Sequence, residues 1–266
     1  MPRKRTVGIL AVTVAVATAA VASMLASQVG SASAAAALDP AVAPGGNFNL
    51  SVWQLQLPIG SPGKPTTIQP AQLKGPNGFT NGNFFTDKTN GSMTFWAPEK
   101  GVTTPNSKYA RSELREMNSN GTAADWQLPG THRLSATVRV TQVPKSVAVG
   151  QVHLGSGGST KPLLELYYAP SGNITLGIEN SPAGGQTRHE VGHVPLNTQW
   201  SYVVTITGGN KINLQLNGGS TRTWTIPSSF KGYGMYFKAG SYNQSSSSST
   251  TNGAKIKFYA LTVFHG

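Results

Sequence analysis

One motif in the sequence matches the ligand pattern of zinc proteases. His189-Glu190-Val191-Gly192-His193 has the form H-E-x-x-H, in which a helix presents two imidazoles on one face and a glutamate as general base. The flanking residues favour a strand instead, because Gly192 interrupts the motif, Pro195 follows it and no apolar stripe of helical period runs through it. In a strand the two histidines lie about 13 Å apart, too far to share one zinc ion. We therefore expect no metal site here, and no metal or other cofactor for the protein.

Three other segments carry large hydrogen-bonding side chains at alternate positions. They are RSELRE (111–116), QVH (151–153) and YFKAGSYNQ (236–244). Because successive side chains of a strand point to opposite faces, each segment has one apolar and one polar face. If the three strands are neighbours, their polar faces form a single surface; the alternative is an ordinary solvated sheet face. The polar positions are Arg111, Glu113, Arg115, Gln151, His153, Tyr236, Lys238, Tyr242 and Gln244.

Short strands dominate the rest of the chain. β-Branched and aromatic residues, often alternating with polar ones, predict strands at residues 92–98, 133–143, 163–168, 174–179, 200–207, 211–217 and 255–265. The turn Gly208-Gly209-Asn210 predicts that two of these strands form a β-hairpin. A short helix is indicated only at residues 67–75. So many short strands in a chain of this size indicate an all-β fold, either a sandwich or a jelly roll.

The N-terminus has the residue order of a secretory signal peptide. Basic residues 3–5 precede a long apolar run, and small residues follow it. A membrane anchor is the alternative, but the A-x-A site Ala32-Ser33-Ala34 and the polar chain after it favour cleavage. We expect an extracellular, secreted protein with a signal peptide at residues 1–34, a flexible leader at 35–46 and one domain at 47–266.

The composition limits the possible partners. The sequence contains no cysteine, which excludes a thiol nucleophile, an iron–sulfur cluster and a cysteine-based zinc site. Without Arg3, Lys4 and Arg5, the lysines and arginines fall from 21 to 18 against 9 acidic residues, so the mature net charge is about +9. This excess indicates a polyanionic partner. For a secreted protein, an acidic polysaccharide fits better than nucleic acid, and we expect a monomer that binds neither nucleic acid nor membrane.

The three polar segments, in this order, resemble the signature regions of the alginate lyases of polysaccharide lyase family 7. The family pattern is R-[ST]-E-[LV]-R-E, then Q-[IV]-H, then Y-F-K-A-G-x-Y-N-Q, and the match extends from Arg111 to Gln244. The resemblance implies a β-jelly roll whose concave sheet binds the polymer, with alginate as the substrate. It also implies a catalytic set, which is Arg111, Gln151, His153 and Tyr242.

These residue types suit a β-elimination. A lyase removes the C5 proton of a uronate, expels the C4 oxygen and leaves a C4=C5 double bond. The adjacent carboxylate must first be neutralised, for which Arg111 offers a permanent cation and Gln151 an amide donor. Tyr242 could transfer the proton, with the nearby cations favouring its phenolate, and His153 is a base or a carboxylate donor. The remaining polar positions would hold neighbouring sugars: Glu113, Arg115, Tyr236, Lys238 and Gln244.

Two other functional classes are alternatives. A glycoside hydrolase needs two carboxylates flanking one bond, but Glu113 and Glu116 are an odd number of residues apart and face opposite sides of a strand. A non-catalytic module that binds acidic polysaccharides would need the basic surface but not the catalytic set. Within the lyase class, Val152 stands where many relatives have isoleucine, and Q-V-H resembles the variants that favour mannuronate. We expect this preference, with polyguluronate or another polyuronate as the alternative substrate.

Overall fold

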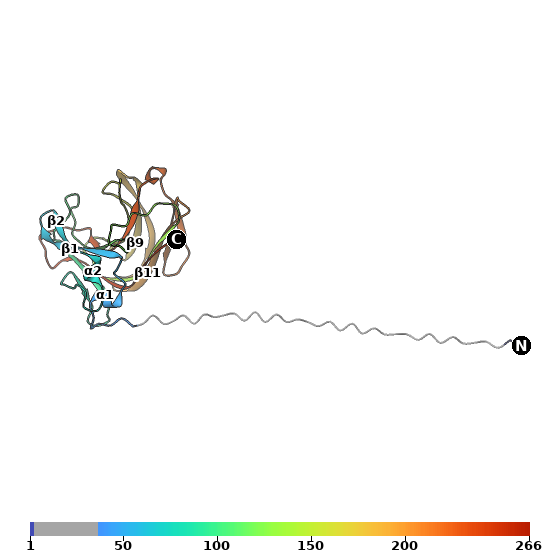
Figure 1. Ribbon diagram of the computed structural model, residues 1–266, viewed down its shortest axis with the longest axis horizontal. Coiled ribbons are helices and arrows are strands. Elements are labelled where there is room, and N and C mark those ends of the chain that lie inside the picture. Colours follow the sequence, from blue (N-terminus) through green and yellow to red (C-terminus); the bar gives the residue numbers. More distant parts are fainter. Residues whose placement is uncertain (3–36) are drawn as a thin grey trace. The chain divides into compact units, whose positions relative to one another are not determined.

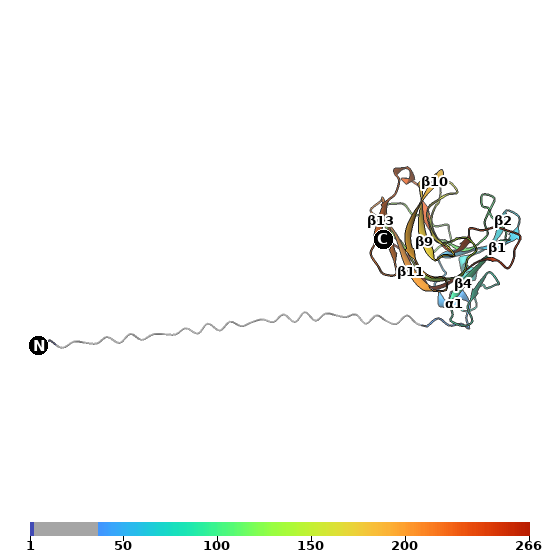
Figure 2. The same cartoon turned by 180° about the vertical axis from the view of Figure 1, so that it is seen from behind.

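The domain is a sandwich of two antiparallel sheets, as the computed structural model shows for residues 1–2 and 37–266 (Figure 1). One sheet has eight strands in the order β10-β9-β8-β7-β14-β5-β1-β2, and the other has seven in the order β13-β12-β11-β6-β15-β4-β3. The two layers are visible again from behind in Figure 2. The expected all-β jelly-roll sandwich is thereby confirmed. The signal peptide expected at residues 1–34 lies outside the described residues, apart from the first two.

The elements have the following bounds. The eight-stranded sheet contains β1 (Trp53–Ser61), β2 (Lys64–Ile68), β5 (Arg111–Glu116), β7 (Val147–Leu154), β8 (Pro162–Tyr168), β9 (Asn173–Ser181), β10 (Gly184–His193) and β14 (Met235–Asn243). The seven-stranded sheet contains β3 (Phe84–Thr86), β4 (Met93–Pro98), β6 (Thr131–Gln142), β11 (Gln199–Thr207), β12 (Lys211–Leu216), β13 (Arg222–Thr225) and β15 (Gly253–His265). The helices are α1 (Pro44–Asn47), α2 (Pro70–Leu73) and the 3-10 helix η1 (Ser228–Phe230).

All seven strands predicted from alternation and residue type are present, as β4, β6, β8, β9, β11, β12 and β15. The predicted hairpin is also confirmed, because β11 pairs with β12 in an antiparallel register that sets Thr207 opposite Lys211. The predicted short helix is α2, which Pro70 starts and a reciprocal bond between Gln69 and Gln72 caps.

The apolar faces of the two sheets meet in one core. Trp53 of β1 and Phe237 of β14 are fully buried on one side, and Trp200 and Tyr202 of β11 on the other. Tyr202 also joins the sheets, because its hydroxyl donates a hydrogen bond of 3.0 Å to the carbonyl oxygen of Val149 in β7. This bond fixes the strand that carries the QVH segment, since a buried hydroxyl needs its partner.

Residues 37–46 differ from the flexible leader that the sequence suggested. The Asn47 side chain accepts a hydrogen bond from the backbone N–H of Asp39 and donates one of 3.1 Å to the carbonyl of Gly91. The backbone N–H of Ala43 donates to the carbonyl of Pro76, and Leu38 packs against the core. The partners of this segment lie far along the chain, which is why its local composition did not reveal its order.

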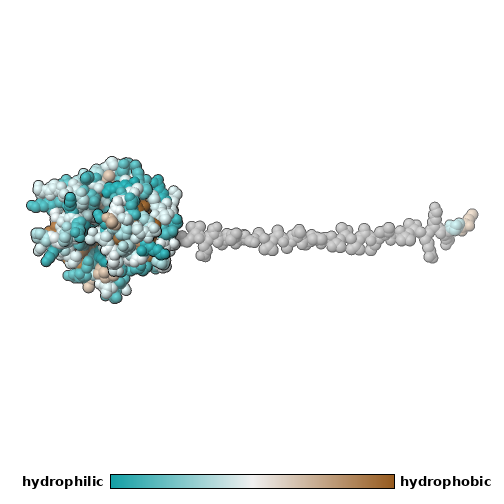
Figure 3. Space-filling model, turned by 90° about the horizontal axis from the view of Figure 1, so that it is seen from above, coloured by the Kyte–Doolittle hydropathy of each residue, from teal (hydrophilic) through white to brown (hydrophobic). Residues whose placement is uncertain are grey.

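The domain face shown in Figure 3 is mainly hydrophilic, with isolated hydrophobic side chains. Among the large apolar residues of the domain, the exposed ones are Ile59, Leu196 and Phe264. Within residues 1–2 and 37–266, no helix has the length and apolar character that a membrane span requires.

Candidate active site

The three polar segments lie on neighbouring strands. In the eight-stranded sheet, β14 lies between β7 and β5, so that Lys238 is opposite Gln151 on one side and Arg115 on the other. Further along the same strands, Tyr236 pairs with His153 and Tyr242 pairs with Arg111. The adjacency that the sequence left as an assumption is therefore confirmed.

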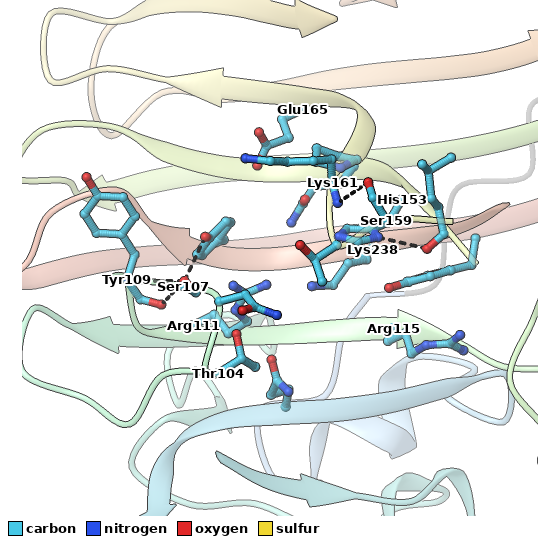
Figure 4. Close-up of a pocket in the computed structure, with 18 of the residues that line it drawn as sticks. Thr104, Ser107, Tyr109, Arg111, Arg115, His153, Ser159, Lys161, Glu165 and Lys238 are labelled. Atoms are coloured by element: carbon cyan, nitrogen blue, oxygen red, sulfur yellow. Dashed lines mark hydrogen bonds between the residues drawn. The ribbon is translucent and has the colours of Figure 1, made fainter. Parts of the chain in front are cut away.

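The polar faces of these strands form the floor of a cleft of about 540 Å³ (Figure 4). Loop residues around Ser107 and around Lys161 close it on two sides, and β1 adds Gln54 and Gln56. Of the nine polar positions named from the sequence, eight line this cleft: Arg111, Arg115, Gln151, His153, Tyr236, Lys238, Tyr242 and Gln244.

Glu113 is the exception, because it lies beneath the floor. Its side chain has 0% exposure, so direct contact with a sugar, as the sequence suggested, is not compatible with its position. Its carboxylate instead accepts a hydrogen bond from the Gln151 amide and forms ion pairs with Lys238 at 2.6 Å and Arg111 at 3.5 Å. Glu113 thus fixes three residues of the floor. Gly240 permits this packing, since a Cβ there would lie 2.7 Å from the Glu113 Cα.

Lys238 carries its charge in a buried place. Burial lowers the pKa of Lys238 to about 8, although the Glu113 carboxylate acts in the opposite direction. The Arg111 guanidinium adds to the lowering by repulsion between like charges. The floor is therefore cationic at neutral pH, with two positive groups held by one carboxylate.

His153 is held as a neutral imidazole of defined tautomer. Its Nδ1 lies 3.0 Å from the carbonyl oxygen of Leu154, which can only accept, so Nδ1 carries the proton and Nε2 keeps a free lone pair. Burial lowers the pKa of His153 to about 4, and the charge of Lys238 acts in the same direction. The ring stacks on Tyr236 with centroids 5.2 Å apart. His153 can therefore accept a proton or a hydrogen bond through Nε2.

Tyr242 lies between a cation and a hydroxyl group. The Arg111 guanidinium carbon lies 3.8 Å from the centroid of its ring, and its hydroxyl is 3.0 Å from Ser107 Oγ. Ser107 Oγ also contacts the carbonyl of Tyr109 and accepts the N–H of that residue. The Ser107 proton can thus point either to Tyr109 or to Tyr242, so this serine can serve as acceptor or donor for the phenol.

Three further predicted residues are also fixed, Arg115 and Tyr236 at one end of the cleft and Gln244 at the Tyr242 end. Arg115 donates to the carbonyl oxygens of Glu116 and Ala124, and its guanidinium carbon lies 4.0 Å from the centroid of the Tyr236 ring. Burial raises the pKa of Tyr236, while the Arg115 charge opposes this, so the phenol stays protonated at neutral pH. Gln244, beyond the end of β14, turns its amide back to the Tyr242 carbonyl at 3.2 Å.

The H-E-x-x-H segment is a strand, as predicted. It belongs to β10, which pairs with β9 so that His189 lies opposite Leu176 and His193 opposite Asn173. His189 contacts the Trp224 ring, with centroids 5.5 Å apart, and His193 Nε2 lies 3.0 Å from the Ser171 carbonyl oxygen. Within residues 1–2 and 37–266, no group of three or more acidic or histidine side chains is arranged to hold a metal ion.

The two carboxylates of RSELRE face opposite ways, which agrees with the argument against a hydrolase pair. Glu116 points to the other side of the sheet, where it accepts hydrogen bonds from Trp126 Nε1 at 3.0 Å and from the backbone N–H of Phe237 at 2.9 Å. Its Oε1 also lies 2.5 Å from His265 Nε2, within hydrogen-bond distance. Glu116 is therefore part of the packing, not of the cleft.

Several cleft residues were not found from the sequence. They are Gln54 and Gln56 of β1, Ser107 of a loop, Glu165 of β8 and Glu179 of β9. Alternation in "WQLQL" could have indicated Gln54 and Gln56. Ser107 has no such signal, because its partner Tyr242 is 135 residues away in the chain.

Comparisons with known proteins point to one family. The family model for alginate lyase matches residues 48–265. An alginate lyase of Klebsiella pneumoniae is 29% identical over 285 positions, covering 84% of this chain and 92% of that protein. A solved variant of the family 7 alginate lyase A1-II′, in complex with substrate (GGMG), is 32% identical, covers 85% of this chain and 98% of its own, and has a TM-score of 0.74.

A second solved structure, an alginate lyase from Pseudomonas aeruginosa, is 28% identical with a TM-score of 0.73, covering 82% of this chain and 99% of its own. The family match includes almost every residue of the sandwich, and both structures share its fold. The chain therefore belongs to the alginate lyases of polysaccharide lyase family 7.

Proposed function

We propose that the protein is a secreted, monomeric enzyme that cleaves alginate by β-elimination and prefers mannuronate blocks. The observation that carries this proposal is the set of four groups in one cleft, where Arg111 and Gln151 are held by the buried Glu113 while His153 and Tyr242 remain available to a ligand. No step requires a metal or an organic cofactor.

The first requirement of the reaction is a neutralised carboxylate on the sugar. Arg111 supplies a full positive charge, and Gln151 has a second amide N–H besides the one that it donates to Glu113. Both groups are buried and fixed before substrate arrives, so they stabilise the developing enolate charge without reorganisation. Lys238 adds positive charge from below through its ion pair with Glu113.

Tyr242 performs the proton transfer in mannuronate, where the C5 proton and the C4 oxygen lie on the same side. The phenolate takes the C5 proton, the freed electron pair forms the C4=C5 bond, and the bond from C4 to the leaving oxygen breaks. Tyr242 then returns its proton to that oxygen. Ser107 supports both states, since its hydroxyl donates to the phenolate and turns to the Tyr109 carbonyl when the phenol is neutral.

Guluronate needs a base separate from the acid that protonates the leaving oxygen, because its C5 proton and C4 oxygen lie on opposite sides. His153 is the candidate, with a free Nε2. Val152 is fully buried in the core beside it, where relatives with isoleucine have one more methylene. A slight shift of this strand moves His153 relative to Tyr242. It therefore disturbs the near-attack geometry of the guluronate route, which uses both residues, more than that of the mannuronate route, which uses Tyr242 alone.

The decisive experiment compares purified polymannuronate and polyguluronate at equal concentration. Formation of the unsaturated product raises the ultraviolet absorbance, and a hydrolase or a binding module produces no such rise. We expect product from both polymers and a faster rate on polymannuronate. Absence of unsaturated product would contradict β-elimination, whereas faster cleavage of polyguluronate would contradict only the preference.

Other features support the proposal of secretion and of a monomeric state. The basic, apolar and small-residue segments at the N-terminus have the order of a cleaved signal. The isolated character of the exposed apolar residues supports a monomer, because stable dimer interfaces are large and apolar at their centre. Fractionation of a culture that expresses the full chain, followed by light scattering of the secreted protein, tests both.

A further inference from the structure

Two buried carboxylates lie in the cleft beside the cationic floor. Glu165 of β8 is 7% exposed and Glu179 of β9 is 6% exposed, and both line the same cleft as Arg111 and Lys238. Figure 4 shows Glu165 on one side of Lys238 and Arg111 on the other. Buried acids oppose the binding of a polyanion, so their place in this cleft requires a specific reason.

Glu165 is fixed by neighbours on its own sheet. Its Oε2 accepts hydrogen bonds from the Tyr167 hydroxyl and from Gln186 Nε2, the latter at 3.0 Å. Arg188 Nε in turn donates to Gln186 Oε1 at 2.9 Å, which fixes the orientation of that amide. Gly177 leaves room for the Gln186 side chain, because a Cβ at position 177 would lie 2.4 Å from that side chain. The Glu165 carboxylate is therefore an acceptor held in one place.

Glu179 is a buried acceptor that lacks a partner within the described chain. Its Oε2 is inaccessible to water and receives no hydrogen bond from residues 37–266. Burial raises the pKa of Glu179, and the Glu165 charge raises it further, while Lys161 and Arg188 oppose the shift. A buried acceptor without a donor costs free energy, and a rotation of the carboxylate that brings this oxygen to the cleft, which Glu179 lines, would let a ligand supply the donor.

We infer that Glu165 and Glu179 form a subsite that binds the hydroxyl edge of the sugar next to the one whose carboxylate lies on Arg111 and Gln151. This inference rests on the proposed function, and it names hydroxyl groups, not a second carboxylate, as the ligand. A uronate ring brings hydroxyls on C2 and C3, which are donors that carboxylates accept.

The spacing of the strands agrees with the repeat of the polymer. Gln151 and Glu165 are opposite each other on adjacent strands, which lie about 4.8 Å apart, a length similar to that of one sugar unit. The equatorial 1,4-linkages of polymannuronate turn successive rings over, so that carboxylate and hydroxyl edges alternate along one side. A floor that changes from cationic at Arg111 and Lys238 to acidic at Glu165 and Glu179 matches that alternation.

The test is the substitution Glu179→Gln, with Glu190→Gln as the matched control. Glu190 lies on the neighbouring β10, is exposed and is outside the cleft, so both variants make the same change of charge on the same sheet. On polymannuronate we expect Glu179→Gln to raise KM about tenfold with kcat within about twofold of the wild type, and Glu190→Gln to change neither. The higher KM should persist at high salt, because a hydrogen bond inside the cleft is screened little.

Two results would overturn the inference. An unchanged KM would mean that Glu179 contacts no sugar, and a lower KM would mean that its charge merely repels the polymer. Thermal unfolding of each variant excludes a folding defect, and Glu165→Gln should raise KM in the same direction. If the wild type forms no unsaturated product, the proposed function is wrong, but the inference can still be tested. Calorimetry then compares the affinity of an oligomannuronate for the wild type and for Glu179→Gln, and weaker binding by the variant would support the subsite.

Discussion

Lys238 Nζ lies 2.6 Å from Glu113 Oε2, and both side chains are almost fully removed from solvent. An ion pair in such a place contributes little stability by itself, but removal of one partner leaves a buried charge uncompensated. Because Glu113 also holds Arg111 and Gln151, the pair organises the cationic floor of the cleft.

We therefore predict that Glu113→Ala loses both activity and stability. The free energy of unfolding should fall by about 3–5 kcal/mol, the usual cost of breaking a buried pair. Urea denaturation followed by fluorescence measures this change. The double variant Glu113→Ala/Lys238→Met should recover part of the stability but not the activity, and an activity near that of the wild type would contradict the role of Glu113 in positioning.

A second prediction concerns Tyr242. If it transfers the proton, Tyr242→Phe should bind polymannuronate with nearly unchanged affinity while kcat falls at least about a hundredfold. The ring remains to pack on Arg111, so the fold should be kept. Calorimetry gives the affinity and ultraviolet absorbance gives kcat. Turnover close to that of the wild type would remove Tyr242 from the mechanism.

Ser107 is predicted to be a positioning residue for Tyr242. Ser107→Ala removes the hydroxyl 3.0 Å from the phenol. We expect kcat to fall about tenfold with KM unchanged, because the reactive phenolate loses a hydrogen-bond donor while no contact with the sugar is removed. Ser107→Thr retains the hydroxyl and should restore most of the rate. A loss of rate equal in the two variants would indicate a disturbed loop instead.

The strands and their faces were predictable, but the depth of a side chain was not. Alternation placed Arg111, Glu113 and Arg115 on one face, as the structure does. It could not show that the shorter Glu113 would be covered by the longer Arg111 and Lys238, because this depends on neighbours brought together by pairing of β5 with β14. The order of segment 37–46 depends in the same way on distant partners such as Gly91.

Partner strands also explain why the acidic side of the cleft was missed. Glu165 lies in a run of apolar residues, where a single acid carries no pattern of its own. Its place in the cleft depends on strand pairing, which puts Glu165 opposite Gln151 of β7 on one side and opposite Gly177 of β9 on the other. The H-E-x-x-H segment shows the reverse case, since glycine and proline near the motif were enough to predict a strand.

That strand leads to a prediction about metal removal. Dialysis against EDTA should leave turnover within about twofold of the untreated enzyme, because the histidines of β10 contact Trp224 and the Ser171 carbonyl. His189→Ala and His193→Ala should likewise have small effects on kcat. Complete loss of activity in EDTA, with recovery on addition of zinc, would show that the strand interpretation misses a functional metal.

The pH dependence of kcat/KM should have two limbs. The pKa of His153 is lowered to about 4, so its Nε2 is free at neutral pH and becomes protonated only as the pH falls through that value. Activity on polyguluronate, for which His153 is the proposed base, should therefore persist on the acid side well below the ordinary histidine pKa of about 6.5. The pKa of Lys238 is lowered to about 8, so the floor loses one positive charge as the pH rises through that value, and kcat/KM should decline on this side.

The alkaline limb can be assigned with one substitution. Lys238→Arg keeps a charge at every pH in the range, because a guanidinium does not lose its proton there. If Lys238 causes the decline near pH 8, the variant should keep its kcat/KM to higher pH, even where its absolute rate is lower because the larger group disturbs Glu113. Initial rates on polymannuronate from about pH 4 to about pH 10 at constant ionic strength give both profiles. An alkaline limb at the same pH in wild type and Lys238→Arg would show that another group titrates there. The positive charge of Lys238 would then not be what sustains kcat/KM on the anionic substrate.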